Sequence, residues 1–200
     1  MLWIALATED TLSEEVGLRL VAELGRAFSV QHKFRKGGNG YLKANLSKFC
    51  QVAERQPTLL ITDLDNATCP VSLISEWKGR LRIPPQLFFR VAVREIESWL
   101  LADHTAMRKF LGLRSATGIP KQPDFLSDAK QTLLNLARKA PREIRNNLCL
   151  ESGSVASQGL GYNTCLSVFI RDNWDPARAE RHSDSLRRTR HRLRLFAEQV

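Results

Sequence analysis

The first half of the chain alternates between short apolar runs and longer stretches with apolar residues at helical spacing. Strands are predicted where the apolar runs have strand length, over residues 2–7, 28–34, 58–62 and 87–93. Helices are predicted between them, over residues 12–24, 41–55, 71–80 and 94–103. Strands that alternate with helices are typical of an α/β fold with a mostly parallel sheet flanked by helices.

The second half of the chain has a different pattern, because the strand signal fades after about residue 103. A helix is predicted up to residue 139 from a start near Ser127, a short one follows Pro141, and two helical segments fill residues 173–200. Residues 152–161 read as a loop of small residues. We therefore predict an α/β core over residues 1–110 and an α-helical C-terminal extension over residues 111–200, packed together as one structural unit.

Composition and charge narrow the class of protein. The hydrophobic fraction of 43% is that of a globular protein, and no apolar run approaches the roughly 18 residues that span a bilayer. The apolar N-terminus lacks a basic start and runs directly into Glu9, so it predicts a buried strand of a soluble, cytoplasmic protein with no membrane partner. The net charge of +9 favours polyanionic partners such as nucleic acid.

The cysteines and histidines do not have the spacing of a zinc site. The four cysteines form no C-x-x-C pair and are predicted to be reduced thiols, and the four histidines add no ligand spacing. Metal chemistry in this chain would therefore use oxygen ligands.

Acidic residues directly follow three of the predicted strands: Glu9, the pair Asp63 and Asp65, and the pair Glu95 and Glu97. The carboxyl ends of parallel strands open onto one edge of a sheet, so the three groups are expected to converge there. Residues two apart on an extended segment face the same way, so Asp63 and Asp65 can point at one ion. Glu95 and Glu97 do likewise only if the chain is still extended there, and otherwise one of them points into the site.

Clustered carboxylates repel one another unless a cation lies among them, and Mg²⁺ binds through one or two carboxylates with water and phosphate oxygens. The alternative is that these acidic residues are ordinary helix N-caps, which are common after strands.

The combination of Glu9 with Asp63-Leu64-Asp65 resembles the Toprim signature, a glutamate after the first strand and a later D-x-D. The stretch VAVREIESWLLAD, over residues 91–103, is more distinctive and resembles a motif of small bacterial Toprim-like proteins akin to OLD-type nucleases. Segments around Tyr162 and Trp174 resemble the helical C-terminus of that family. The resemblance implies a Toprim, Rossmann-like fold.

The resemblance also implies roles for the acidic residues. Glu9 matches a metal ligand or general acid/base, Asp63 and Asp65 match the metal-binding pair, and Glu95 and Glu97 match further acidic positions. We assign Glu97 to the metal and give Glu95 a supporting role in catalysis. The implied cofactor is Mg²⁺ or Mn²⁺. One departure is Asp10, which stands where the family usually has glycine.

Four basic residues are candidate contacts for nucleic acid: Lys36, Arg94, Arg188 and Arg192. Lys36 opens a glycine-rich loop over residues 36–40, which is either a phosphate contact or a plain turn. The arginines of the last helix equally fit a solvated basic surface.

The expected function is that of a divalent-metal-dependent nuclease that hydrolyses phosphodiester bonds, with DNA favoured, in phage defence or DNA processing. Two alternatives stay open: a phosphohydrolase of nucleotides or small phosphate esters, and a non-catalytic Toprim module that binds nucleic acid or a partner ATPase. A homo-oligomer is also left open.

Overall fold

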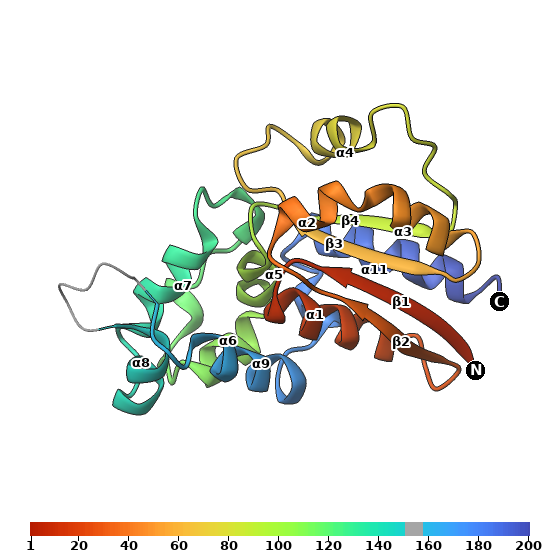
Figure 1. Cartoon of the computed structure of the whole chain (residues 1–200). Coiled ribbons are helices and arrows are strands. Elements are labelled where there is room, and N and C mark those ends of the chain that lie inside the picture. Colours follow the sequence, from red (N-terminus) through yellow and green to blue (C-terminus); the bar gives the residue numbers. More distant parts are fainter. Residues whose placement is uncertain (151–157) are drawn as a thin grey trace. The chain divides into compact units, whose positions relative to one another are not determined.

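A computed structural model of the chain describes residues 1–150 and 158–200 (Figure 1). Part of the predicted loop over residues 152–161 therefore lies outside the described residues. The described chain forms two compact units, one made of Met1–Val93 with Arg188–Val200 and the other of Arg94–Arg187. The sequence placed the division near residue 110 and assigned the last helix to the extension. In the structure the end of that helix belongs to the first unit.

The first unit, called the α/β unit below, is built on a four-stranded sheet in which every neighbouring pair is parallel. The strand order is β2-β1-β3-β4. Its elements are β1 (Leu2–Thr8), α1 (Thr11–Ala22), β2 (Phe28–Phe34), α2 (Asn39–Ala44), α3 (Leu46–Ala53), β3 (Thr58–Asp63), α4 (Pro70–Lys78), β4 (Leu87–Ala92) and the C-terminal part of α11 (Asp184–Ala197). The predicted α/β class, with a parallel sheet flanked by helices, is confirmed.

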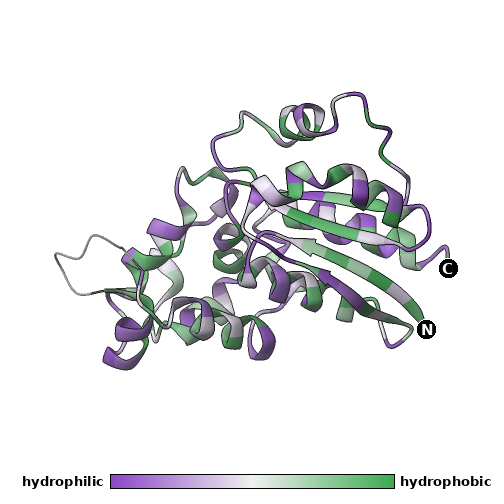
Figure 2. Cartoon of the chain, viewed as in Figure 1, coloured by the Kyte–Doolittle hydropathy of each residue, from purple (hydrophilic) through white to green (hydrophobic). Residues whose placement is uncertain are grey.

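Helices cover both faces of this sheet, which is why its central strands β1 and β3 are largely hydrophobic (Figure 2). On one face Ala7, Leu60 and Phe89 join a buried cluster with side chains from α2, α3 and α4. On the other face α1 approaches β1 so closely that a Cβ at Gly17 would lie 2.6 Å from Leu6. The ring of Phe196, from α11, packs on Phe88 of β4.

The helix predicted over residues 41–55 is two helices in the structure, α2 and α3. Asn45 lies between them, and its side-chain amide donates a hydrogen bond to the Tyr41 carbonyl oxygen at 2.9 Å. Asparagine side chains compete in this way with the backbone hydrogen bonds of a helix. The helix is therefore interrupted at Asn45, although the helical spacing of the apolar residues continues through it.

The second unit, called the helical unit below, consists of helices and two short 3₁₀ turns. They are α5 (Ile96–Ala102), α6 (His104–Phe110), η1 (Ala116–Gly118), η2 (Pro123–Phe125), α7 (Ala129–Ala137), α8 (Arg142–Leu148), α9 (Tyr162–Asp172) and α10 (Pro176–Ala179). Its core is formed around Trp99, Tyr162 and Trp174, which are fully buried. The Trp174 indole N–H donates to the Trp99 carbonyl oxygen at 3.0 Å, so a polar group of this core is satisfied internally.

All four cysteines are free thiols, as predicted. None of the helices in the described residues is long and apolar enough to cross a membrane.

Candidate functional site

The order of the strands places the ends of β1 and β3 side by side. The chain runs from β1 outward to β2 and then returns to β3 on the other side of β1, so the direction of winding reverses between β1 and β3. Ligands of open α/β sheets bind outside the carboxyl ends of the strands at such a reversal. Glu9 directly follows β1, and Asp63 is the last residue of β3.

Glu9 reaches across this reversal and is bonded to the end of β3. Its Oε1 accepts a hydrogen bond from the Asp63 backbone N–H at 2.9 Å and another from the buried Thr62 hydroxyl. The second oxygen, Oε2, forms no hydrogen bond with any residue in the described ranges. The carboxylate is therefore held in place through one oxygen, which leaves the other available to a ligand.

The environment of Glu9 favours its protonated form. Burial raises the pKa of the Glu9 carboxyl above 4.5, while the hydrogen bonds from Thr62 and Asp63 act in the opposite direction. The negative charges of Asp65 and Asp10 raise this pKa further. A cation at this end of the sheet would offset both the burial and the repulsion.

Asp65 lies on the turn that follows β3 and is exposed to solvent. Its φ of 47° is in the left-handed region, which aspartate tolerates better than most residues. Its Oδ2 accepts a hydrogen bond from the Asn39 side chain at 2.9 Å. In this conformation the alternation of an extended strand no longer holds after Asp63, so the sequence argument that Asp63 and Asp65 face the same way does not apply directly.

The glycine-rich segment over residues 36–40, predicted as a loop, ends in the first two residues of α2 and is attached to the same end of the sheet. The Gly38 N–H donates to the Glu9 carbonyl oxygen at 3.3 Å, and Asn39 bonds Asp65 as described. The sequence singled out this loop only as a phosphate contact or a plain turn. Asn39 and Thr62 were not predicted as site residues, and only the structure places them at the candidate site. No sequence pattern distinguishes them from other polar residues of the chain.

Asp10 has a structural role at the start of α1. It is the N-cap of α1, and its Oδ1 accepts a hydrogen bond from the Ser13 backbone N–H at 2.8 Å. N-capping is the common use of aspartate at the start of a helix. For Asp10, the N-cap alternative considered from the sequence is the one that the structure supports.

The residues at this end of the sheet fit a hard divalent cation by their chemistry. The candidate ligands, Glu9, Asp63 and Asp65, all carry carboxylate oxygens, and Mg²⁺ uses one or two carboxylates together with water and phosphate oxygens. Histidine, cysteine, aspartate and glutamate side chains form no group of three or more arranged for a metal ion anywhere in the described residues.

The other two acidic candidates belong to the helical unit. Glu95 is the N-cap residue of α5, in an extended conformation, and its Oε2 accepts a hydrogen bond from the Lys130 backbone N–H at 2.8 Å. Glu97 lies inside the helix, and its Oε1 accepts a hydrogen bond from the Tyr162 hydroxyl at 2.8 Å. The two side chains thus diverge to separate partners, as expected if the helix has already begun.

Among the described residues of the helical unit, Glu97 has the most strongly raised carboxyl pKa. Its side chain is buried, with 5% exposure, and burial raises its pKa to about 7 against the effect of the Tyr162 hydrogen bond. The charge of Glu95 raises this pKa further, and that of Lys130 lowers it. The Lys130 ammonium also lies 5.3 Å from the centre of the Tyr162 ring.

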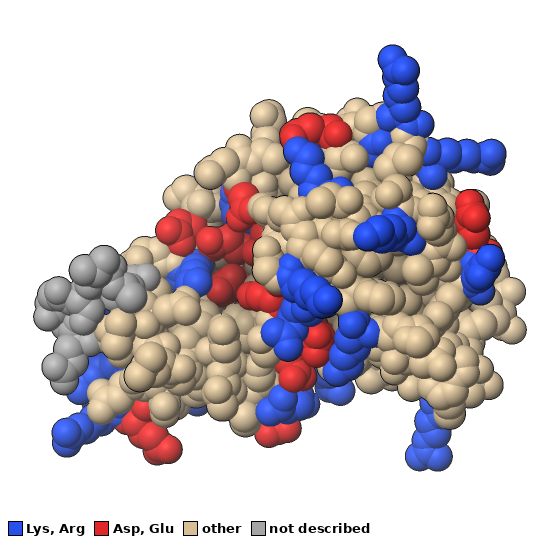
Figure 3. Space-filling view, in the orientation of Figure 1, with Lys and Arg blue, Asp and Glu red and all other residues tan. Residues whose placement is uncertain are grey.

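The four basic candidates lie on three separate segments of the chain. Lys36 is exposed on the glycine-rich loop, Arg94 is half-buried in the helical unit, and Arg188 is exposed on α11. Arg192 lies against the α/β unit, with its guanidinium 5.4 Å from the centre of the Phe88 ring. On the face drawn in Figure 3, lysine and arginine side chains are scattered over the surface, and some lie beside acidic side chains.

No protein-family model, curated protein or solved structure matches this chain, so its function has to be inferred from these residues.

Proposed function

We propose that this chain is a divalent-metal-dependent phosphodiesterase of the Toprim type that hydrolyses nucleic acid, DNA in preference to RNA. The observation that carries the proposal is the hydrogen bond from the Asp63 N–H to the Glu9 carboxylate, at the point where the winding of the sheet reverses. That contact brings the glutamate after β1 next to the Asp63–Asp65 pair after β3. The resemblance of both motifs to Toprim proteins supports the same assignment.

Glu9, Asp63 and Asp65 are the residues that would hold Mg²⁺ or Mn²⁺. The ion, when bound, activates water and neutralises charge on the phosphoryl group. Glu9 Oε1 is held by Asp63 and Thr62, which leaves Oε2 to bind the cation or to exchange a proton with water. Its raised pKa suits proton transfer, because a general acid or base works best when its pKa is close to the operating pH.

The experiment is a cleavage assay with purified protein in Mg²⁺ or Mn²⁺, on supercoiled DNA, linear DNA and RNA. Glu9→Gln and Asp63→Asn remove a charge but keep the shape of each side chain, and in Glu9→Gln the amide oxygen still accepts the Asp63 N–H. We expect each to lower the cleavage rate by about 100-fold or more, the range of general acid–base effects. Chelation of the metal should abolish cleavage in the unaltered chain.

Glu54→Gln is the matched control, because Glu54 is an exposed carboxylate of the same unit at the end of α3. Cleavage that is equal in all variants, or that survives chelation, would overturn the proposal. Turnover of nucleotides alone would indicate the phosphohydrolase alternative. Metal binding without turnover of any of these substrates would indicate a non-catalytic module.

A further inference from the structure

Arg90 is a charged residue in the middle of an otherwise apolar strand. In β4, Leu87, Phe89 and Val91 point into the core beneath α2, α3 and α4. Strand alternation therefore turns Arg90 to the opposite face, with Phe88. The register pairs Arg90 with Ile61 of β3.

The guanidinium of Arg90 has no counter-charge in the part of the chain that the structure describes. Its Nε is fully buried and has no hydrogen-bond partner. Burial lowers the pKa of Arg90, and the charged group that lowers it further is another cation, Arg192. The residue as a whole is only partly buried, so its remaining nitrogens are within reach of solvent.

Arg192 is held beside it by contacts that do not use a carboxylate. Its guanidinium lies over the Phe88 ring, and its Nη2 donates to the Pro85 carbonyl oxygen at 3.3 Å. Both contacts orient the side chain without neutralising it. Two arginines are thus directed to one region of the sheet, and neither forms an ion pair with an acidic residue of the described ranges.

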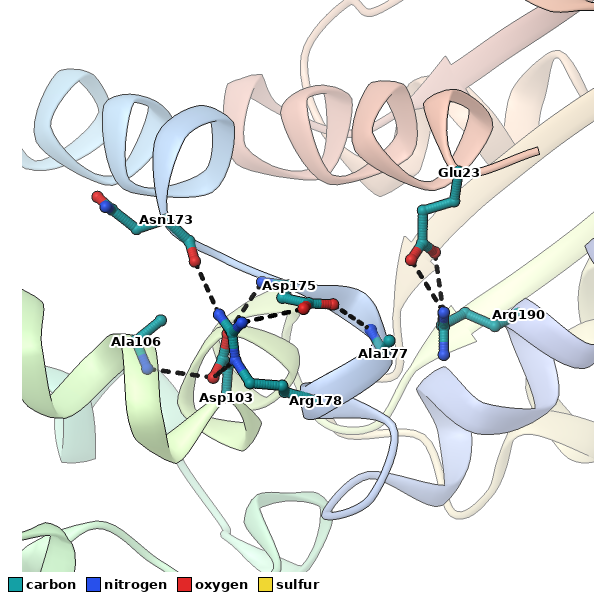
Figure 4. A network of polar contacts seen from close by, with 8 residues as sticks. All are labelled: Glu23, Asp103, Ala106, Asn173, Asp175, Ala177, Arg178 and Arg190. Carbon is teal, nitrogen blue, oxygen red and sulfur yellow. Dashed lines mark hydrogen bonds and ion pairs between the residues drawn. The ribbon is translucent and has the colours of Figure 1, made fainter. Parts of the chain in front are cut away.

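Arg190, on the same helix α11 as Arg192, is a buried arginine whose charge is neutralised. Arg190 forms two parallel hydrogen bonds with the Glu23 carboxylate, each 2.9 Å long (Figure 4). Burying a guanidinium without such a partner is costly, and a second cation nearby adds repulsion. An oxyanion between the two side chains would remove both costs, since guanidinium groups bind phosphate in a bidentate manner.

We propose that Arg90 and Arg192 form a binding site for a phosphate group on the α11 face of the sheet. The phosphate is either free, as phosphate or a phosphate ester, or part of a nucleic-acid backbone. The site needs neither a metal ion nor hydrolysis, so it is independent of the nuclease proposal. An absence of phosphate binding at this site and an absence of cleavage are therefore separate experimental results.

The test uses the full chain with a metal chelator and compares Arg90→Met with the unaltered protein. Arg26→Met is the control, because Arg26 is an exposed arginine of the same unit. We expect inorganic phosphate, added at constant ionic strength, to raise the unfolding temperature of the unaltered chain and of the control but not of Arg90→Met. Without phosphate, Arg90→Met should unfold at a higher temperature than the unaltered chain, since an uncompensated charge has been removed.

Binding of a DNA oligonucleotide, followed by fluorescence anisotropy over a range of salt, distinguishes the two sources. If the site holds a backbone phosphate, Arg90→Met lowers the slope of log affinity against log salt by about one. If it holds free phosphate, the slope is unchanged while the phosphate effect on unfolding is lost. An equal response to phosphate in Arg90→Met and the control overturns the proposal. Should Arg90→Met fail to fold, Arg192→Met carries the same comparison, because methionine keeps the packing on Phe88.

Discussion

At the scale of single residues, Glu9 is partly buried and Glu97 is buried, and both carboxyl groups have raised pKa values, but they are held differently. Glu9 accepts its hydrogen bonds from a backbone N–H and a threonine hydroxyl, at an edge of a sheet. Glu97 accepts one from a tyrosine inside a helical core. Burial is the largest cause of the pKa shift in both, so both destabilise the folded state when they ionise.

Glu97 should make the stability of the chain depend on pH. Its pKa rises from 4.5 to about 7 on folding, so between these values the folded state holds a proton that the unfolded state has lost. The free energy of unfolding therefore falls as the pH rises through this range, by up to about 3 kcal/mol from this group.

The expected result is that Glu97→Gln removes this contribution, because glutamine stays neutral and its carbonyl still accepts the Tyr162 hydroxyl. The measurement is chemical denaturation of both proteins from about pH 4.5 to pH 8, a range that brackets the shift, with a chelator present. The difference in stability between variant and unaltered chain should grow with pH in favour of the variant. A difference that stays constant would show that Glu97 does not titrate in this range.

At the scale of secondary-structure elements, Asp103 joins three helices of the helical unit (Figure 4). It ends α5 and caps α6, where its carboxylate accepts the Ala106 N–H at 3.1 Å. The same carboxylate accepts the Asp175 N–H at 2.9 Å, next to α10, and two hydrogen bonds from Arg178 at 2.9 and 2.7 Å. Because Asp103 is 0% exposed, these bonds replace its entire contact with water.

Asp103→Asn should destabilise the chain by about 3 kcal/mol, since it removes the buried counter-charge of Arg178 and leaves that partly exposed guanidinium only its pair with Asp175. Glu76→Gln is the comparison, because it breaks the exposed ion pair with Lys43 and should cost less than about 1 kcal/mol. Urea denaturation measures both. Equal costs for the two variants would mean that burial adds nothing to the Asp103–Arg178 pair.

At the scale of the whole molecule, the two ends of the chain meet in one unit. Phe196 packs on Phe88 with ring centres 5.0 Å apart and on Phe28 at 6.1 Å. Arg190 forms its double hydrogen bond with Glu23 at the end of α1. The α/β unit is therefore incomplete without its C-terminal segment, Arg188–Val200.

A chain that ends at residue 187 should lose the cooperative unfolding of its α/β unit. A chain that ends at residue 197 is the control, because residues 198–200 are exposed. Hydrogen exchange at the amides of β1 and β3 is the measurement. We expect protection in the control and its loss in the shorter chain. Equal protection in both would show that α11 is dispensable for the sheet.

The sequence predicts some residues of the candidate site but not others. Glu9, Asp63 and Asp65 were identified because each follows a short apolar run, and a strand end is a local feature. Asn39 and Thr62 were not identified, since hydrogen bonds to residues 26 and 53 positions away leave no local pattern. The left-handed turn at Asp65 was also missed, because a D-x-D reads as a continuing strand.

The sequence by itself determined the α/β class, the positions of the four strands and the helical character of residues after 103, because burial leaves a period of about two in strands and about 3.6 in helices. Only the tertiary structure decided which strands are neighbours, that α11 completes the sheet unit, and that Glu9 bonds the end of β3. These features depend on contacts between segments far apart in the chain, and local periodicity carries no information about which segments meet.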